Sequence, residues 1–175
     1  MTGRSIPDPG FAGDHGDAAP ALTAALASYA GGSGSHVDAL AAVRASRLLV
    51  PVVAVLGEVE VDDHGLAHDK TSDMATVLLQ GADGRMALLA FSGTPALRAW
   101  DPQARPVPVT ARTAAQAALQ DGASAIVVDI AGPASFVVEG DDLEGLARGW
   151  VLARVGGRSA WVAPDGGTGG IGRRA

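Results

Sequence analysis

The sequence of 175 residues contains no cysteine. Disulfide bonds, thiolate nucleophiles and cysteine-ligated metal sites are therefore excluded. The chain suits a reducing compartment, so we expect it in the cytoplasm. Aromatic residues are also scarce, at 4% of the chain, and the core must consequently be built from alanine, valine and leucine. Lysine occurs once, as Lys70, beside twelve arginines.

Long apolar runs are missing as well. The longest spans nine residues, from Leu48 to Leu56, and contains Pro51, whereas a membrane-spanning helix needs about 20. The N-terminal segment carries acidic residues and glycines in place of the basic and apolar stretches of a secretory signal. We therefore expect neither a membrane partner nor an export signal.

Basic charge is too sparse for nucleic-acid binding. The chain carries 13 basic and 19 acidic residues, for a net charge of −6. Because phosphate binding needs a concentrated basic face, we expect no nucleic-acid partner. The chain does hold 47% hydrophobic residues with 18% charged residues, and this balance is typical of a globular domain with a proper core.

The composition divides the chain into three parts. Residues 1–19 are rich in glycine, aspartate and proline with little to bury, and they predict a disordered leader. Residues 20–155 carry the periodic patterns of one folded domain. Residues 156–175 are glycine-rich with a basic end, and they predict a flexible tail.

The hydrophobic pattern of the middle part predicts alternating helices and strands. Prolines, glycines and capping residues mark their ends. The expected elements are helices from Pro20 and Ser35, a strand over 47–56, a hairpin of 74–80 and 86–92, a helix over 96–100, a strand over 107–109, a helix from Thr110 or Thr113 to Gln120, strands over 125–130 and 136–139, and a helix from Asp141 whose end the pattern leaves open as far as Val155.

These elements predict an α+β or α/β fold, a single domain whose mixed β-sheet is packed by helices. Gly81-Ala82-Asp83-Gly84 predicts a tight turn that makes the flanking strands antiparallel neighbours. The strand, helix and strand between 107 and 130 predict a right-handed parallel crossover. Pro51 conflicts with a continuous ladder, so the strand begins or bulges there, or its N–H side lies on an edge.

The acidic segment 62–69 is a candidate metal site because it holds His64 and His68 among aspartates. Imidazoles and carboxylates can bind zinc or another divalent ion. However, Gly65 occupies the position of the catalytic glutamate in an HExxH motif, and its surroundings indicate a loop. A solvated acidic loop explains the same residues, and we expect no bound metal and no cofactor.

The polar segment 69–73 surrounds the lone Lys70 with aspartates and hydroxyls. A nucleophilic lysine must lose its proton, whereas neighbouring carboxylates favour the protonated form. Lys70 is therefore predicted to form ion pairs or hydrogen bonds that fix the loop, or to contact a ligand. The candidate groups for binding a ligand or partner are Asp69, Lys70, Ser72, Asp73, Arg85 and Arg105.

Four stretches resemble the SseB (enhanced serine sensitivity) family of bacteria, specifically the N-terminal domain of its actinobacterial members. They are the strand at 47–54, the polar segment at 69–75, the hairpin and helix at 84–100, and the unit at 104–133. The resemblance implies a cytoplasmic α/β domain. It implies no agreed enzymatic activity, no established cofactor and no catalytic residue.

The sequence thus predicts a non-enzymatic cytoplasmic domain that binds a protein or a small ligand, in a regulatory role. No GxSxG elbow is present, and no Ser-His-Asp set can be assembled from the sequence. The alternative is a metal- or ligand-dependent enzyme that uses the loop of His64 and His68. A third hypothesis is a homo-oligomer in which the strand over 107–109 pairs across a two-fold axis.

Overall fold

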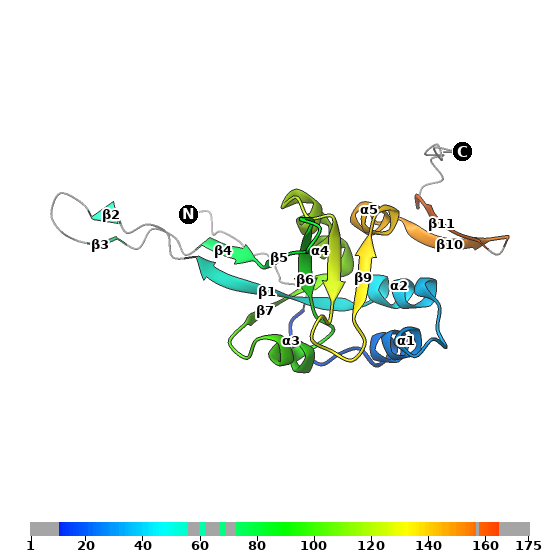
Figure 1. The fold of residues 1–175 in the computed structure, drawn as a ribbon, viewed down its shortest axis with the longest axis horizontal. Coiled ribbons are helices and arrows are strands. Elements are labelled where there is room, and N and C mark those ends of the chain that lie inside the picture. Colours follow the sequence, from blue (N-terminus) through cyan, green and yellow to red (C-terminus); the bar gives the residue numbers. More distant parts are fainter. Residues whose placement is uncertain (1–10, 56–59, 62–66, 69–72, 157, 165–175) are drawn as a thin grey trace, which may run out of the picture.

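The computed structural model describes residues 11–55, 60–61, 67–68, 73–156 and 158–164. These residues form an α+β fold of five helices and several small sheets (Figure 1). The elements are α1 (Pro20–Ala30), α2 (His36–Ala45), β1 (Arg47–Val55), β2 (Glu60–Val61), β3 (Ala67–His68), β4 (Asp73–Thr76), β5 (Leu78–Gln80), β6 (Met86–Ala90), α3 (Thr94–Trp100), β7 (Arg105–Thr110), α4 (Ala111–Gln120), β8 (Ala125–Val128), β9 (Phe136–Glu139), α5 (Asp141–Arg148), β10 (Val151–Val155) and β11 (Arg158–Val162).

A four-stranded sheet in the order β5-β6-β8-β9 forms the centre of the domain. β6 and β8 are parallel, and the two outer pairs are antiparallel. The predicted tight turn is confirmed, since Gly84 has a positive φ of 81° between β5 and β6. The predicted single strand over 74–80 is wrong, because its first half, β4, pairs with β1 and its second half, β5, pairs with β6.

A second sheet, in the order β4-β1-β7, is antiparallel throughout. Leu49 and Phe91 join it to the central sheet through two backbone hydrogen bonds of 2.8 Å. Since alternate residues of an antiparallel strand point their N–H groups to the same side, Pro51 lacks its N–H on the side of Phe91. At that place the neighbour of β1 changes to β4, whose pairing begins at Val52. The proline therefore interrupts no ladder bond.

The parallel crossover was predicted to join β7 to β8, and this pair of strands is wrong. β8 lies parallel to β6, whereas β7 pairs with β1 in the other sheet. The same alternation places the missing N–H groups of Pro106 and Pro108 on the outer side of β7. Over these residues the outer side of β7 has no backbone N–H donor, so a further strand would form few hydrogen bonds there. β7 is an edge strand, as its prolines indicated. The helix of the unit, α4, begins after Thr110 as predicted.

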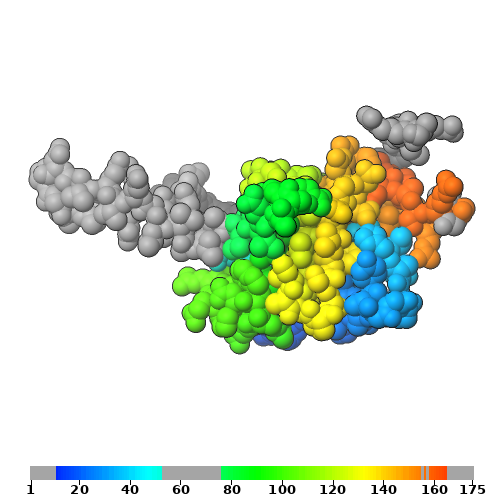
Figure 2. Space-filling view, viewed as in Figure 1, coloured from blue at the N-terminus to red at the C-terminus, as the bar shows by residue number. Residues whose placement is uncertain are grey.

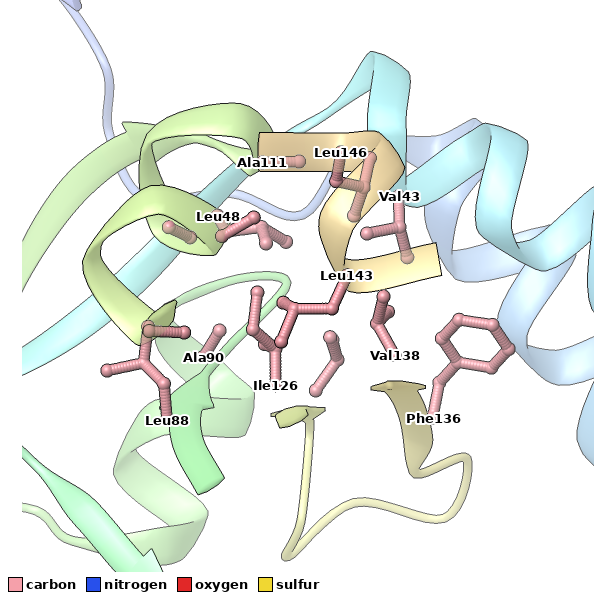
Figure 3. Packing of buried hydrophobic residues seen from close by; sticks show 14 of the residues in the cluster. Val43, Leu48, Leu88, Ala90, Ala111, Ile126, Phe136, Val138, Leu143 and Leu146 are labelled. Atoms are coloured by element: carbon pink, nitrogen blue, oxygen red, sulfur yellow. The ribbon is translucent and has the colours of Figure 1, made fainter. Parts of the chain in front are cut away.

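Helices α1, α2, α4 and α5 cover one face of the central sheet and enclose the main core (Figure 1). Leu143 from α5 and Ile126 from β8 point toward one another at its centre, and both are 1% exposed (Figure 3). On the opposite face, Leu97 of α3 packs in a smaller core with Leu89 and Phe91. None of the helices in the described residues combines the length and apolarity that crossing a membrane requires.

The chain on both sides of the predicted domain makes contacts that the sequence did not indicate. Ahead of α1, the backbone of Gly16 accepts a 2.7 Å hydrogen bond from Thr94. After α5, the helix ends at Arg148 because Gly149 takes a left-handed conformation, with φ 70°. The strands β10 and β11 then form a hairpin where we predicted the end of a helix and the start of a flexible tail.

Trp161 of β11 fastens this hairpin to α5. Its indole N–H donates a 2.8 Å hydrogen bond to Asp142. Its ring lies over Gly145, where an added Cβ would come within 2.2 Å of the indole. The sequence did not indicate this contact, because the glycine content of the segment predicted a flexible tail. The alternating side chains of residues 158–162 favour a strand instead.

Candidate functional site

The predicted polar segment falls mostly outside the described residues. Asp69, Lys70, Ser72 and His64 lie there, so their assignment as candidate groups stays a prediction. Asp73 is the first residue of β4, paired with Val55. His68 lies in the short strand β3, paired with Glu60. Across the described part of the chain, no three His, Asp or Glu side chains gather in a way that could hold a metal ion.

Arg85 lies just after the β5–β6 turn, and two carboxylates hold its guanidinium. The Arg85 Nε lies 2.6 Å from an oxygen of Asp83, and an Nη lies 2.9 Å from an oxygen of Glu139. The hydrogen bond from Arg85 is the main cause that lowers the pKa of Asp83, and the same bond is the main cause that raises the pKa of Arg85. All three side chains are more than half exposed, so this is a solvated surface cluster.

Arg105 begins β7, is exposed, and is paired with Val52 in the three-stranded sheet. Arg85 directly precedes β6 of the four-stranded sheet. Arg85 borders a hollow of about 450 Å³ on the outer face of that sheet, and Arg105 is not among the residues that line it. The structure therefore does not bring the two predicted arginines into one site.

A different pair of polar residues stands at the ends of the two parallel strands. Ser92 follows β6, and Asp129 follows β8 directly. Because the carboxyl ends of parallel strands meet at one edge of a sheet, these side chains come together, and such edges are the usual binding crevices of α/β sheets. Ser92 is 6% exposed and Asp129 is 8% exposed. They are the two buried polar or charged residues of the described chain.

The carboxylate of Asp129 holds Ser92 with both of its oxygens. Oδ1 accepts a 2.8 Å hydrogen bond from the Ser92 backbone N–H, and Oδ2 accepts a 2.6 Å hydrogen bond from the Ser92 hydroxyl. Asp129 has a φ of 54°, the only positive φ among the described residues other than glycine. Such backbone conformations are strained, and they occur preferentially at functional sites.

The pair borders a crevice of about 470 Å³ between α1, α3 and the loop that leads from β8 to β9. Figure 1 shows this loop descending between α3 and α1, and Figure 2 shows its surface in yellow between the green and blue regions. The remaining lining is almost entirely apolar: Ala18, Thr23, Leu26, Ala27, Gly93, Pro95, Ala96, Ala99, Ala131, Gly132, Pro133 and Ala134.

Arg47 holds the Ser92 turn and the segment ahead of α1, both of which contribute to the lining of the crevice. Its guanidinium donates a 3.1 Å hydrogen bond to the carbonyl of Ser92. Its Nε pairs with a carboxylate oxygen of Asp14 at 2.6 Å, and an Nη donates to the carbonyl of Asp17. The segment ahead of α1 is thereby tied to β1 and to the Ser92 turn, which places Ala18 in the wall of the crevice.

The family model of the SseB protein N-terminal domain matches residues 22–145. The chain belongs to the SseB family. The match covers most of the SseB domain described above, from α1 into α5, and therefore includes both Ser92 and Asp129. A search of curated proteins and a search of solved structures each found no match.

The sequence of this SseB domain carried one signal for the crevice that the sequence analysis did not use. Each of the two strands ends in a polar residue that a glycine and a proline soon follow, in Ser92-Gly93-Thr94-Pro95 and in Asp129-Ile130-Ala131-Gly132-Pro133. Two such strand ends mark one site only if the strands are parallel neighbours. The incorrect pairing of β8 with β7 concealed this.

Proposed function

We propose that this SseB domain is a non-enzymatic binding module and that the crevice at the ends of β6 and β8 holds a small ligand. The observation that carries the proposal is the convergence of the two buried polar side chains, Ser92 and Asp129, on one largely apolar crevice. Small-ligand sites combine these features, and they commonly have volumes of roughly 300–1,000 Å³.

The contacts within the crevice support recognition rather than chemistry. The Ser92 hydroxyl is committed to Asp129, and both oxygens of Asp129 fix the turn of Ser92. His36 hydrogen-bonds Asp142, and neither of these two residues lines the crevice. The Ser92–Asp129 pair is therefore a fixed polar group on a rigid wall, as a selective binding site requires.

The broader role is part of the same proposal. A ligand that bridges α1 and α3 would stabilise one arrangement of the two helices, which supports a regulatory role. The lack of cysteine supports a cytoplasmic setting. The abundance of alanine, glycine and arginine supports the actinobacterial type within the SseB family. Two further functions stay predictions. One is binding of a protein partner at the polar segment 69–73, and the other is a metal-dependent activity that involves His64.

A fragment screen monitored by amide chemical shifts tests the proposal, with two matched variants on α1. Ala27→Leu places a larger side chain in the crevice, whereas Ala24→Leu adds the same atoms to an exposed position that does not line it. We expect bound fragments to shift the amides of Gly93, Ala96 and Gly132. We expect Ala27→Leu to weaken their binding by about tenfold or more, with no loss in Ala24→Leu.

Shifts that map instead to the surroundings of Arg85 or to residues 69–73 would move the site to the groups that the sequence indicated. A screen in which no fragment shifts the crevice amides would overturn the proposal.

A further inference from the structure

We infer that the ligand of the crevice carries a protonated amine on an apolar body and that Asp129 binds the amine. This inference rests on the proposed function, and it names the chemical class of the ligand. It starts from the negative charge of Asp129. The two hydrogen bonds to Ser92, which are the structural role of this residue, do not require that charge.

The hydrogen bonds of Asp129 leave room for a ligand. An ionised carboxylate offers about four acceptor positions, and Ser92 occupies one on each oxygen. Asp129 lines the crevice, and we expect a donor that enters the crevice to take one of the remaining positions.

Asp129 carries a buried negative charge, and the described residues place no cation in an ion pair with it. The guanidinium of Arg47 donates to the carbonyl of Ser92 and forms its ion pair with Asp14. A buried charge is unfavourable unless hydrogen bonds and opposite charge compensate it. A cationic ligand supplies the opposite charge.

Asparagine could make both hydrogen bonds of the structural role, although without the charge that strengthens them. It tolerates a positive φ, and its amide can accept from the Ser92 N–H and donate to the Ser92 hydroxyl oxygen. The charge is therefore what distinguishes aspartate at this position. The alanines, prolines and Leu26 that complete the lining fit an apolar body, and the same carboxylate repels anionic ligands.

Three probes that share an apolar body test the inference: phenethylamine, phenethyl alcohol and hydrocinnamate. Their binding to the full chain is measured by titration of the crevice amides. We expect the amine to bind, the alcohol to bind at least about tenfold more weakly, and the anion to leave the crevice amides unchanged. Added salt should weaken the binding of the amine more than that of the alcohol.

Asp129→Asn removes the charge and can keep both hydrogen bonds to Ser92. We expect it to weaken amine binding by about tenfold or more and to leave alcohol binding unchanged, with thermal unfolding close to that of the wild type. Glu144→Gln is the matched control, since it removes a negative charge from an exposed pair on α5. We expect it to leave the binding of all three probes unchanged.

Equal binding of the amine and the alcohol in the crevice would overturn the cationic ligand and leave the proposed function standing. Binding of none of the three probes there would overturn the cationic ligand, and a fragment screen without crevice shifts would then overturn the proposed function separately. If Asp129→Asn fails to fold, the comparison of the three probes on the wild-type chain decides alone.

Discussion

Ser35 and Thr110 each stand directly before a helix and close its first turn with a side-chain oxygen. The Ser35 hydroxyl accepts from the N–H of Asp38, and the Thr110 hydroxyl accepts from the N–H of Thr113. Ser35 was predicted at the start of its helix, and Thr110 was one of two residues, with Thr113, predicted at the start of the other. Capping can be predicted because it depends on residues that are near in sequence. The helix α3 begins at Thr94, and its cap position belongs to Gly93, so no side chain closes its first turn. The Thr94 N–H instead bonds Gly16, a partner that local sequence does not reveal.

The cap at Ser35 has a measurable consequence for Asp38. The hydrogen bond from the Ser35 hydroxyl is the main cause that lowers the pKa of Asp38, and the charge of Arg154 lowers it further. Ser35→Ala should therefore raise the pKa of Asp38, and Arg154→Ala should raise it by less. A titration of the carboxyl carbon of Asp38 by NMR measures both shifts.

The sign of the effect on stability follows from the direction of the shift. Because the pKa of Asp38 is lower in the folded chain, the ionised form stabilises the fold above the unfolded value of about 4. That contribution is lost as the pH falls through the folded value. An equal pKa of Asp38 in Ser35→Ala and the wild type would contradict the assigned cause.

At the scale of elements, sequence patterns identified most helices and strands but not all of their partners. The run from Met74 to Gln80 reads as one strand, yet Thr76 pairs with β1 and Leu78 pairs with β6. An apolar run does not indicate which of two neighbouring strands it pairs with, because pairing depends on residues far away in sequence. The crevice was missed for the same reason, since it exists only where two distant strands lie side by side.

The contact between Gly145 and Trp161 predicts that replacing this helix glycine with alanine destabilises the protein, which is the reverse of the usual effect. Alanine normally stabilises a helix interior relative to glycine by roughly 0.5–1 kcal/mol. At Gly145 the added Cβ would collide with the indole of Trp161, so Gly145→Ala should lower the free energy of unfolding and release the hairpin. In a Trp161→Ala background, the same substitution should stabilise the protein by about 0.5–1 kcal/mol.

Urea denaturation of the four chains measures this double-mutant cycle, and NOEs of the Trp161 indole report whether the hairpin is docked. Additive effects of the two substitutions would show that the helix and the hairpin do not contact in this way.

At the scale of the whole molecule, the prolines of β7 protect the domain from pairing with other chains. An exposed strand edge with free N–H groups invites a second strand, and the outer side of β7 has prolines at 106 and 108. Pro106→Val and Pro108→Val together would restore two outward donors. We expect this variant to associate as its concentration rises, with a mean mass above that of the wild type in light scattering.

Pro102→Val is the control, since Pro102 is exposed in the turn after α3. A mean mass of the double variant that equals the wild-type mass at every concentration would contradict the protective role. Pairing through β7, which the sequence suggested as a route to a homo-oligomer, lacks these two donors in the natural chain.

The anchors at Arg47 and Trp161 decide how this domain can be shortened. The family match begins at residue 22, after the segment that Arg47 holds, and ends at residue 145, before Trp161. A fragment cut at these limits would lack Asp14, Asp17 and Ala18 on one side and Trp161 on the other. It would keep the four-stranded central sheet and lose Ala18 from the lining of the crevice, together with the hairpin that packs on α5. We therefore expect such a fragment to bind the proposed ligand of the crevice more weakly than the full chain does.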